Sequence, residues 1–433
     1  MTIVCGIPLD GSQADHSTLQ VAIGLASHTH NRIVIATHVI APGEHVNDEY
    51  VATAQRSLDA VVSAAAAAHD ASMVSISQRV LVGPVAESLA AFAEAEAATC
   101  LVASAHQRIG QPGLGSIAAE LLTLASMPMI LVRDPAPWLS TFAGTRPLRI
   151  LLGVDDSAVC DIALAWVHGL GSTTALDVVL GSVYYADVAA LRYGVAVGHM
   201  IDRNSEVETL LSRDMLRRFH APAAVPGHPE MTVRAHPKLG LGRIGDHILE
   251  IANQESTDVI VVGTSQKTGL GKLGSVSTAI VNGANQSVIC IPPTAMVPVR
   301  VAAPMRCVVV ATDGSAFANR AVPYAYGLCS QTPDAEVHLI HVIDTDDHVD
   351  QTTLRAHLQL LVPTNATAQS FIHILVGAKP ADELATVAAR LGADIICIAS
   401  HGRSGLARAL VGSVADQLLR QTRLPVMVLR PSS

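Results

Sequence analysis

Short apolar runs and longer amphipathic stretches alternate along the whole chain. The runs are rich in Val, Ile and Leu, which is typical of strands buried in a parallel sheet, and Ala- and Leu-rich stretches lie between them. In the last third, this pattern predicts strands at 306–313, 336–344, 367–377, 394–400 and 425–431, and helices at 315–329, from about 350, at 380–391 and at 413–421. Five strands alternating with four helices predict an open, mostly parallel α/β sheet with right-handed crossovers.

The pattern occurs three times. TIVCGIPLDGS (2–12), LRILLGVDDS (148–157) and RCVVVATDGS (306–315) each resemble a strand that ends in an aspartate, namely Asp10, Asp155 and Asp313. Each copy later shows a strand, a polar loop, a Gly-Ser pair and a helix, and closes on a short strand: PMILVRDP, SVICIPPT or LPVMVLRP. The Pro-containing stretches 136–147 and 292–304 are predicted to be linkers. We therefore predict three tandem domains, at 1–136, 147–294 and 305–433.

The aspartate and the glycine loop of each copy are predicted to face one crevice. In open α/β sheets, ligands bind beyond the carboxyl ends of the strands, near the point where the strand order reverses. In the third copy, Gly412-Ser413 opens a helix, whose N-terminal N–H groups and dipole favour an anion. Asp313 can accept a hydrogen bond from a ribose hydroxyl or an adenine amine. The pair suits a nucleotide better than a lone phosphate, which the carboxylate would repel.

These residues resemble the nucleotide-binding branch of the universal stress protein family, whose pattern is Gly-x-x-Gly, nine residues, then Gly-Ser/Thr. The resemblance covers nearly the whole chain as three tandem Rossmann-like domains, similar to those of the adenine nucleotide alpha hydrolases. It implies ATP, AMP or cyclic AMP as ligand, with Mg²⁺ held through the phosphates. The implied adenine and ribose contacts are Ala311, Thr312, Asp313, Val342 and Ile398, and the implied phosphate contacts are Ala399, His401, Gly402, Gly412, Ser413 and Val414.

The three copies depart from this pattern to different degrees. The third replaces only the first glycine, by Ala399. The second keeps Asp155, Gly263, Gly274 and Ser275 but has Gln266 for the second glycine and a shorter spacer. The first has Ala103 and His106 at the two early glycine positions, before Gly115-Ser116. Nucleotide binding is therefore expected mainly in the third domain.

Composition narrows the function classes. The net charge of −9 argues against nucleic-acid binding, and the chain shows neither a membrane-length apolar run nor an apparent signal peptide. The seven cysteines form no CxxC pair and are expected to be buried, reduced thiols, so we expect a cytoplasmic protein.

Other motifs do not carry a function. Gly240-x-Gly242-x-x-Gly245 matches a dinucleotide fingerprint, but Asp258 comes too early to be its acidic residue. P-loop and GxSxG motifs are absent, and neither an HExxH motif nor a Cys/His spacing marks a zinc site. The acidic clusters 155–156 and 344–347 are interpreted as solvated loop charge rather than cation sites.

The function we expect is a stress-response or signalling module that binds ATP or AMP, with slow hydrolysis at most and no predicted catalytic residue. The alternative is a ligand-independent oligomerising or interaction protein with degenerate sites. A weaker alternative, an adenylating enzyme, lacks the SGGxDS motif at the first strand. Three apolar edge strands cannot pair evenly within one chain. We therefore expect two domains to pair internally and the third to pair with a second chain, as the final strands of the family do.

Overall fold

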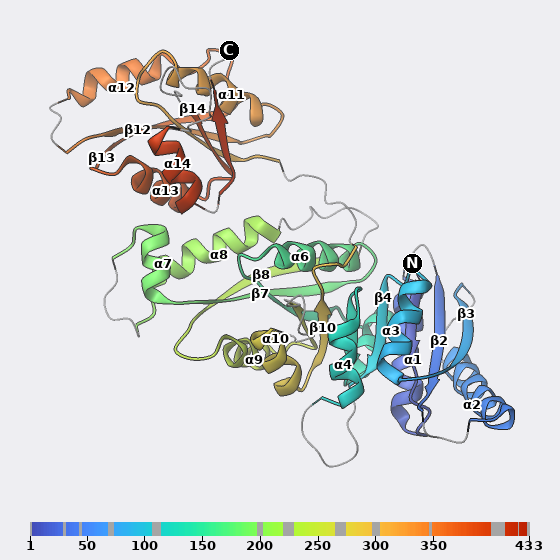
Figure 1. Ribbon diagram of the computed structural model, residues 1–433. Coiled ribbons are helices and arrows are strands. Elements are labelled where there is room, and N and C mark those ends of the chain that lie inside the picture. The colour runs from blue at the N-terminus through green and yellow to red at the C-terminus, as the bar shows by residue number, and fades with distance from the viewer. Residues whose placement is uncertain are drawn as a thin grey trace, which may run out of the picture. The chain divides into compact units, whose positions relative to one another are not determined.

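The computed structural model describes most of the chain: residues 2–28, 32–42, 46–67, 73–105, 114–196, 202–219, 229–264, 274–296, 304–345, 349–399, 412–422 and 424–430. By its internal contacts the chain divides into two compact units, residues 1–184 with 215–300 and residues 185–214 with 301–433. Both units are α/β structures whose parallel strands are flanked by helices (Figure 1).

The first repeat contributes five parallel strands in the order β3-β2-β1-β4-β5. Its elements are β1 (Thr2–Gly6), α1 (Gln13–Ser27), β2 (Ile33–Ile40), α2 (Asp48–Ala67), β3 (Ser75–Val82), α3 (Val85–Ala95), β4 (Cys100–Ser104), α4 (Ser116–Leu124) and β5 (Met129–Val132). The first strand lies at the centre, between β2 and β4, so the strand order reverses there, as predicted.

The second repeat has the same order, β8-β7-β6-β9-β10, with an additional helix between β7 and β8. Its elements are β6 (Leu148–Gly153), α6 (Ala158–Gly171), β7 (Leu176–Tyr184), α7 (Ala186–Tyr193), α8 (Ser205–Phe219), β8 (Met231–Leu239), α9 (Ile244–Gln254), β9 (Val259–Gly263), α10 (Ser275–Gly283) and β10 (Ser287–Ile291). Residues 185–214, which hold α7 and most of α8, belong to the second compact unit.

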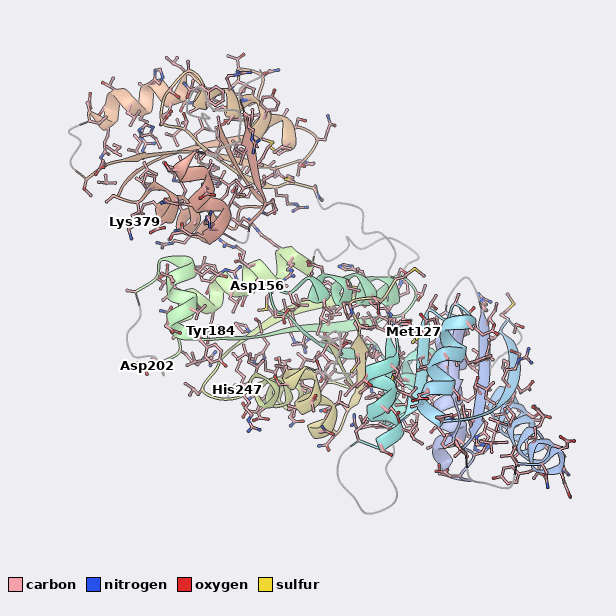
Figure 2. All side chains as sticks on the ribbon, in the orientation of Figure 1. Met127, Asp156, Tyr184, Asp202, His247 and Lys379 are labelled. Atoms are coloured by element: carbon pink, nitrogen blue, oxygen red, sulfur yellow. The ribbon has the colours of Figure 1, made fainter. Side chains whose placement is uncertain are left out.

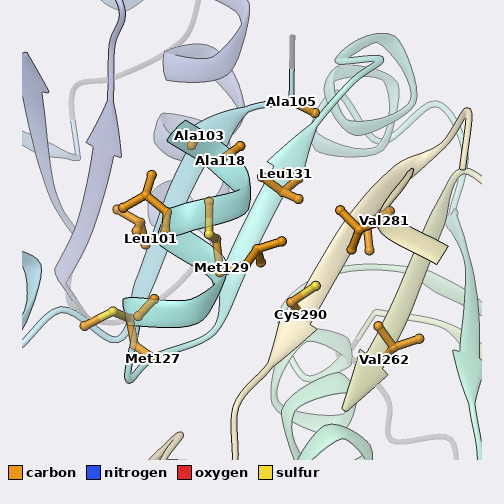
Figure 3. Close-up of a cluster of buried hydrophobic side chains, with 14 of the residues drawn as sticks. Leu101, Ala103, Ala105, Ala118, Met127, Met129, Leu131, Val262, Val281 and Cys290 are labelled. Atoms are coloured by element: carbon orange, nitrogen blue, oxygen red, sulfur yellow. The ribbon is translucent and has the colours of Figure 1, made fainter. Parts of the chain in front are cut away.

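The final strands of these two repeats pair with each other. β5 and β10 run antiparallel, with Ile130 opposite Ile289, and so join the two halves into one ten-stranded sheet. Both strands are buried along their whole length. One apolar cluster continues across the junction, from Leu101 and Met129 to Cys290 and Val262 (Figure 3). Internal pairing of two of the three predicted edge strands is confirmed.

The third repeat forms a separate five-stranded sheet in the order β13-β12-β11-β14-β15. Its elements are β11 (Cys307–Ala311), a 3-10 turn (Ala318–Arg320), α11 (Ala321–Leu328), β12 (Glu336–Ile343), α12 (Gln351–Gln359), β13 (Gln369–Val376), α13 (Pro380–Leu391), β14 (Ile395–Ala399), α14 (Ser413–Gln421) and β15 (Val426–Leu429). α13 and α14 pack on one face of this sheet, and α11 packs on the other (Figure 1). The predicted first helix of this repeat begins later than expected, after the 3-10 turn.

One predicted linker is partly a packed helix. α5 (Ala136–Phe142) lies within 136–147, and Trp138 at its start is completely buried. Phe142 packs against α1 at Gly24, where an added Cβ would lie 2.1 Å from the phenyl ring. The two aromatic side chains therefore make α5 part of the core of the first repeat, and the linker prediction is wrong over these residues.

All seven cysteines are free and buried, as predicted. Burial raises the pKa of the Cys100, Cys290 and Cys397 thiols to about 12. These thiols are therefore protonated at neutral pH and are poor nucleophiles.

Candidate functional site

The candidate site of the third repeat lies where β11 and β14 end side by side. Ala311 pairs with Ile398 in the parallel ladder, so Thr312 and Asp313 emerge next to Ala399. β12 pairs with one side of β11 and β14 pairs with the other. The strand order therefore reverses at β11, which is the switch point of the sheet. The ends of the first and fourth strands of this repeat thus lie side by side, as predicted, and the position beyond them is where the sequence places its predicted crevice.

Hydrogen bonds fix the loop after β11. The Thr312 amide donates to the Ile340 carbonyl (3.0 Å), and the Thr312 hydroxyl donates to Asn319 Oδ1 (2.7 Å). The Ser315 amide donates to Asp313 Oδ1 (2.9 Å), which closes an Asx turn around Gly314. Gly314 has φ +80°, a conformation that favours glycine. Asp313 is left exposed at the crevice.

Three of the implied adenine-side residues, Ala311, Val342 and Ile398, turn their side chains toward the core. Ala311 and Ile398 are buried in the apolar cluster beneath α13 and α14, and Val342 packs against the same cluster, as does Val414 of the implied phosphate side. A ligand at this position would therefore contact mainly their main-chain atoms.

α14 begins without a capping side chain. Its N-cap is Gly412, and no side-chain cap hydrogen bond is present there, while Ser413 at the first helical position is exposed. Gly412 has φ −56° and ψ 154°, which any residue can adopt. The backbone conformation therefore does not explain why this residue is glycine. Close approach of a ligand would explain it, because glycine has no Cβ to obstruct the ligand. His401 and Gly402, the remaining predicted phosphate contacts, lie outside the described residues.

His341 lies beside this crevice and was not predicted. Its Cε1 atom would be 3.9 Å from a Cβ added at Gly314, and its buried Nδ1 has no hydrogen-bond partner among the described residues. Burial lowers the pKa of His341, although a hydrogen bond at the Thr312 backbone and nearby Asp313 oppose this effect. A signal was available in the sequence, since THVI (37–40) and IHVI (340–343) place a histidine at the same point of both repeats.

The corresponding site of the second repeat differs in two respects. Asp155 accepts hydrogen bonds from the amide and hydroxyl of Ser157, and Arg218 donates to the Asp155 carbonyl oxygen. At Gly263, an added Cβ would lie 2.8 Å from Val159 of α6, so packing accounts for this glycine.

The glycine loop of the second repeat is only partly described. Gly274 is the N-cap of α10 with φ −60°, again without a side-chain cap bond, and Ser275 is exposed. Gln266 lies outside the described residues. The helix terminus is therefore present, but the loop that precedes it is not part of the described geometry.

In the first repeat, a carboxylate already occupies the loop. Asp15 is 1% exposed and accepts hydrogen bonds from the amides of Leu9 and Gly11, each 3.1 Å. Burial and the neighbouring Asp10 raise the pKa of Asp15, against these two hydrogen bonds. This carboxylate therefore holds the loop that corresponds to the Asp313 turn of the third repeat. His106 lies outside the described residues, and Gly115 is the N-cap of α4.

The Gly240-x-Gly242-x-x-Gly245 motif is accounted for by packing. An added Cβ at Gly245 would lie 2.7 Å from the Ala279 Cβ and 3.3 Å from the Val276 carbonyl of α10. His247, labelled in Figure 2, accepts a hydrogen bond from the Leu241 amide at Nε2 (3.1 Å). These contacts hold the turn and let α9 and α10 pack closely.

In the described part of the chain, no helix combines the length and apolarity needed to cross a membrane.

Comparison with known proteins gives three matches to the sequence model of the "Universal stress protein family", at residues 2–133, 148–292 and 305–430. The universal stress protein Rv2005c of Mycobacterium tuberculosis is 26% identical over 301 residues, which are 65% of this chain and 97% of the relative. A universal stress protein structure from Archaeoglobus fulgidus is 16% identical with a TM-score of 0.48, covering 67% of this chain and 98% of that chain. A universal stress protein solved in complex with cAMP is 26% identical with a TM-score of 0.26, covering 30% of this chain and 100% of that chain.

Proposed function

Because this chain belongs to the universal stress protein family in each of its three repeats, we propose that it binds an adenine nucleotide, mainly in the third repeat, as a stress-response or signalling module. One observation carries the proposal. The ends of β11 and β14 lie side by side at the switch point, and the next helix after β14, α14, has no side-chain cap at its N-terminus. A helix N-terminus of this kind attracts phosphate through its N–H groups and dipole.

The proposed contacts are divided between a phosphate side and an adenine and ribose side. Amides at Gly412, Ser413 and Val414, with the Ser413 hydroxyl, would hold phosphate, and His401, Gly402 and Ala399 would complete that side. Asp313 would accept a hydrogen bond from the ribose, and the backbone at 311–312, 342 and 398 would border the adenine. Mg²⁺ would be bound through the phosphate oxygens. His341 is added here as a contact of the sugar side, because its buried Nδ1 lies near the Asp313 turn.

The three repeats should differ in affinity. The first repeat departs furthest from the family pattern, with Ala103 and His106 at the two early glycine positions. The second keeps Asp155, Gly274 and Ser275, but its Gly263 is explained by contact with Val159. We therefore expect the order third, second, first, with the first repeat a scaffold.

Binding rather than catalysis is proposed. The described residues around Asp313 hold neither a base hydrogen-bonded to a nucleophile nor an arginine aimed at a phosphate position, so hydrolysis would be slow at most. The alternative is an interaction protein that needs no ligand. A cytoplasmic location remains a prediction.

We also propose that the third repeat pairs with a second copy of the chain through β15. β15 occupies the position of β5 and β10 in the strand order, yet all four of its residues are only partly buried. At the β5–β10 junction, the Arg133 side chain donates to the carbonyls of Val281 and Gln286 across the interface. Arg430 follows β15 as Arg133 follows β5, so it could serve the same contact in a homodimer.

Calorimetric titration of nucleotide-stripped protein with MgATP tests the nucleotide proposal. Gly412→Ala should keep the fold, because φ −56° suits alanine, but should weaken binding at least tenfold, because the new Cβ projects at the phosphate position. Gly115→Ala makes the same change at the equivalent N-cap of the first repeat, with φ −61°, and is the matched control.

The stoichiometry and the variants decide between the alternatives. One site per chain, lost in Gly412→Ala and retained in Gly115→Ala, would support the proposal. No heat with MgATP, AMP or cAMP, together with no shift in thermal unfolding, would contradict it and favour the ligand-independent alternative.

A further inference from the structure

A cluster of chemically unlike side chains lies where β11 and β12 begin, at the opposite ends of the strands from the predicted nucleotide site. Cys307 is the first residue of β11 and Glu336 the first of β12, and the two pair directly in the parallel ladder. His338 follows two residues after Glu336, so it points to the same face of the sheet. The Cys307 Sγ, a Glu336 carboxylate oxygen and a His338 ring nitrogen all lie within 4.8 Å of one another.

The cluster is buried on one side and open on the other. Cys307 is 1% exposed and His338 is 4% exposed, whereas the Glu336 side chain is 40% exposed. His338 is held in place by a stacked Phe371, with ring centroids 4.8 Å apart. An ion could therefore enter from the Glu336 side and meet two immobilised ligands.

Hydrogen bonds already orient the imidazole. His338 Nε2 faces Glu336 Oε2 at 3.2 Å, and His338 Nδ1 lies 2.9 Å from His373 Nε2. In the tautomer that donates its Nδ1 proton to His373 Nε2, His338 can bind a metal ion through Nε2, the nitrogen that lies beside Glu336. Metal-binding histidines are commonly held by a second hydrogen bond of this kind.

The second repeat has two arginines at the positions equivalent to this cluster, and it serves as a comparison. The two ladders share a register, since Ile150 pairs with Val259 as Val308 pairs with Ile395. By that register, Arg149, Asp177, Arg234 and His236 of the second repeat stand where the third has Cys307, Glu336, Phe371 and His373.

In the second repeat these side chains form an ionic network. Arg149 Nε donates to Asp177 at 2.7 Å, and Arg234 bridges Asp177 and Glu255. The third repeat keeps the carboxylate at this position but replaces both arginines with a thiol and a phenyl ring. A bound cation would supply the positive charge that the arginines supply in the second repeat.

We propose that Cys307 Sγ, His338 Nε2 and Glu336 bind a Zn²⁺ ion, with water as the fourth ligand on the exposed side. Thiolate, imidazole and carboxylate are the donor types that Zn²⁺ selects, and tetrahedral bonds would separate sulfur and nitrogen by about 3.5 Å, so the cluster needs only a small contraction. Cys307 now donates its S–H to the Leu391 carbonyl at the end of α13 (3.8 Å). The negative end of that helix dipole favours a cation nearby.

The proton balance is simple. Binding breaks the S–H bond of Cys307 and releases its proton to solvent, so affinity should rise with pH as the thiolate forms. His338 binds through Nε2 in its neutral form, with its proton on Nδ1 donated to His373. Glu336 contributes a carboxylate oxygen as ligand. No oxidation or reduction takes place.

Titration of the metal-free full chain with Co²⁺ tests the site, because a cobalt–thiolate bond gives a near-ultraviolet charge-transfer band that histidine and carboxylate sites lack. We expect one such band per chain, removed by Cys307→Ser and displaced stoichiometrically by Zn²⁺. Cys329→Ser is the matched control, since Cys329 is equally buried in the same repeat but outside the cluster. His338→Gln should weaken Zn²⁺ binding at least 100-fold.

A second variant separates ligation from folding. His373→Gln keeps all three ligands and should weaken Zn²⁺ binding roughly 10- to 100-fold, as loss of a supporting hydrogen bond does at other metal sites. A Co²⁺ spectrum without a charge-transfer band, or a band unchanged in Cys307→Ser, would overturn the proposal. The readout needs no nucleotide, so failure of the nucleotide proposal would leave this result unaffected.

Discussion

At the scale of single residues, some ionisable side chains of this protein are stabilised by several partners at once. Asp177 is the clearest case, because it accepts hydrogen bonds from Arg149, Arg234 and Thr232. Burial raises the pKa of Asp177, but these three hydrogen bonds outweigh burial and hold the pKa below its usual value.

Asp177→Asn should therefore lower the free energy of unfolding by about 1.5–3 kcal/mol at pH 7, the range for hydrogen bonds to charged groups. The folded pKa is depressed, so this stabilisation is complete above the unfolded pKa of about 3.9 and is lost as the pH falls through the folded value. Urea unfolding at pH 7 and pH 3 should show a smaller difference from the wild type at pH 3. Asp202→Asn, at an exposed position labelled in Figure 2, should change little at either pH.

At the scale of elements, helix pairs depend on a few positions without a side chain. Gly245→Val should destabilise the protein by about 1–3 kcal/mol, because the new side chain would overlap the Ala279 Cβ and the Val276 carbonyl of α10. Gly242→Ala changes the same turn, but its Cβ would meet only His247 Nε2, at 3.8 Å. Thermal unfolding should therefore separate the two variants, and equal destabilisation would contradict the packing explanation.

The sequence predicted these elements and their order because the hydrophobic period and the turn residues are local properties. It also predicted that the first and fourth strands of the third repeat end side by side, which the pairing of β11 with β14 confirms. Contact between Asp313 and the glycine loop stays a prediction, because that loop lies outside the described residues. The sequence did not reveal α5, whose helix depends on burial of Trp138 and Phe142 against α1. The cluster of Cys307, Glu336 and His338 was also missed. Two neighbouring strands bring these residues together, and no sequence spacing encodes that contact.

At the scale of the whole molecule, the final strands of the repeats have different surroundings. β5 and β10 pair with each other in the ten-stranded sheet, whereas β15 is only partly buried at the end of its sheet. Ile289 of β10 pairs with Val261, and Met427 of β15 pairs with Cys397, so the two residues are equivalent by register. Ile289 is completely buried at the internal junction, whereas Met427 is only partly buried.

Ile289→Lys should destabilise the ten-stranded sheet by about 2–5 kcal/mol or more, because it removes a buried side chain and places a charge between β5 and β10. Hydrogen exchange of the β5 amides should accelerate in this variant. Met427→Lys should leave that exchange unchanged but convert a homodimer of 45.1 kDa chains to monomers in light scattering. A monomeric wild-type chain would contradict pairing through β15.

The antiparallel junction also has a consequence during synthesis. Arg133, just after β5, contacts Ser287 of β10, which lies 154 residues further along the chain. At 5–20 residues per second, a ribosome needs roughly 8–30 s to make that stretch. Throughout this interval the nascent first repeat presents an apolar edge with no partner from its own chain, and neighbouring ribosomes on one message carry the same edge. Translation speed between β5 and β10, rather than final stability, should therefore set how much of this protein aggregates as it is made.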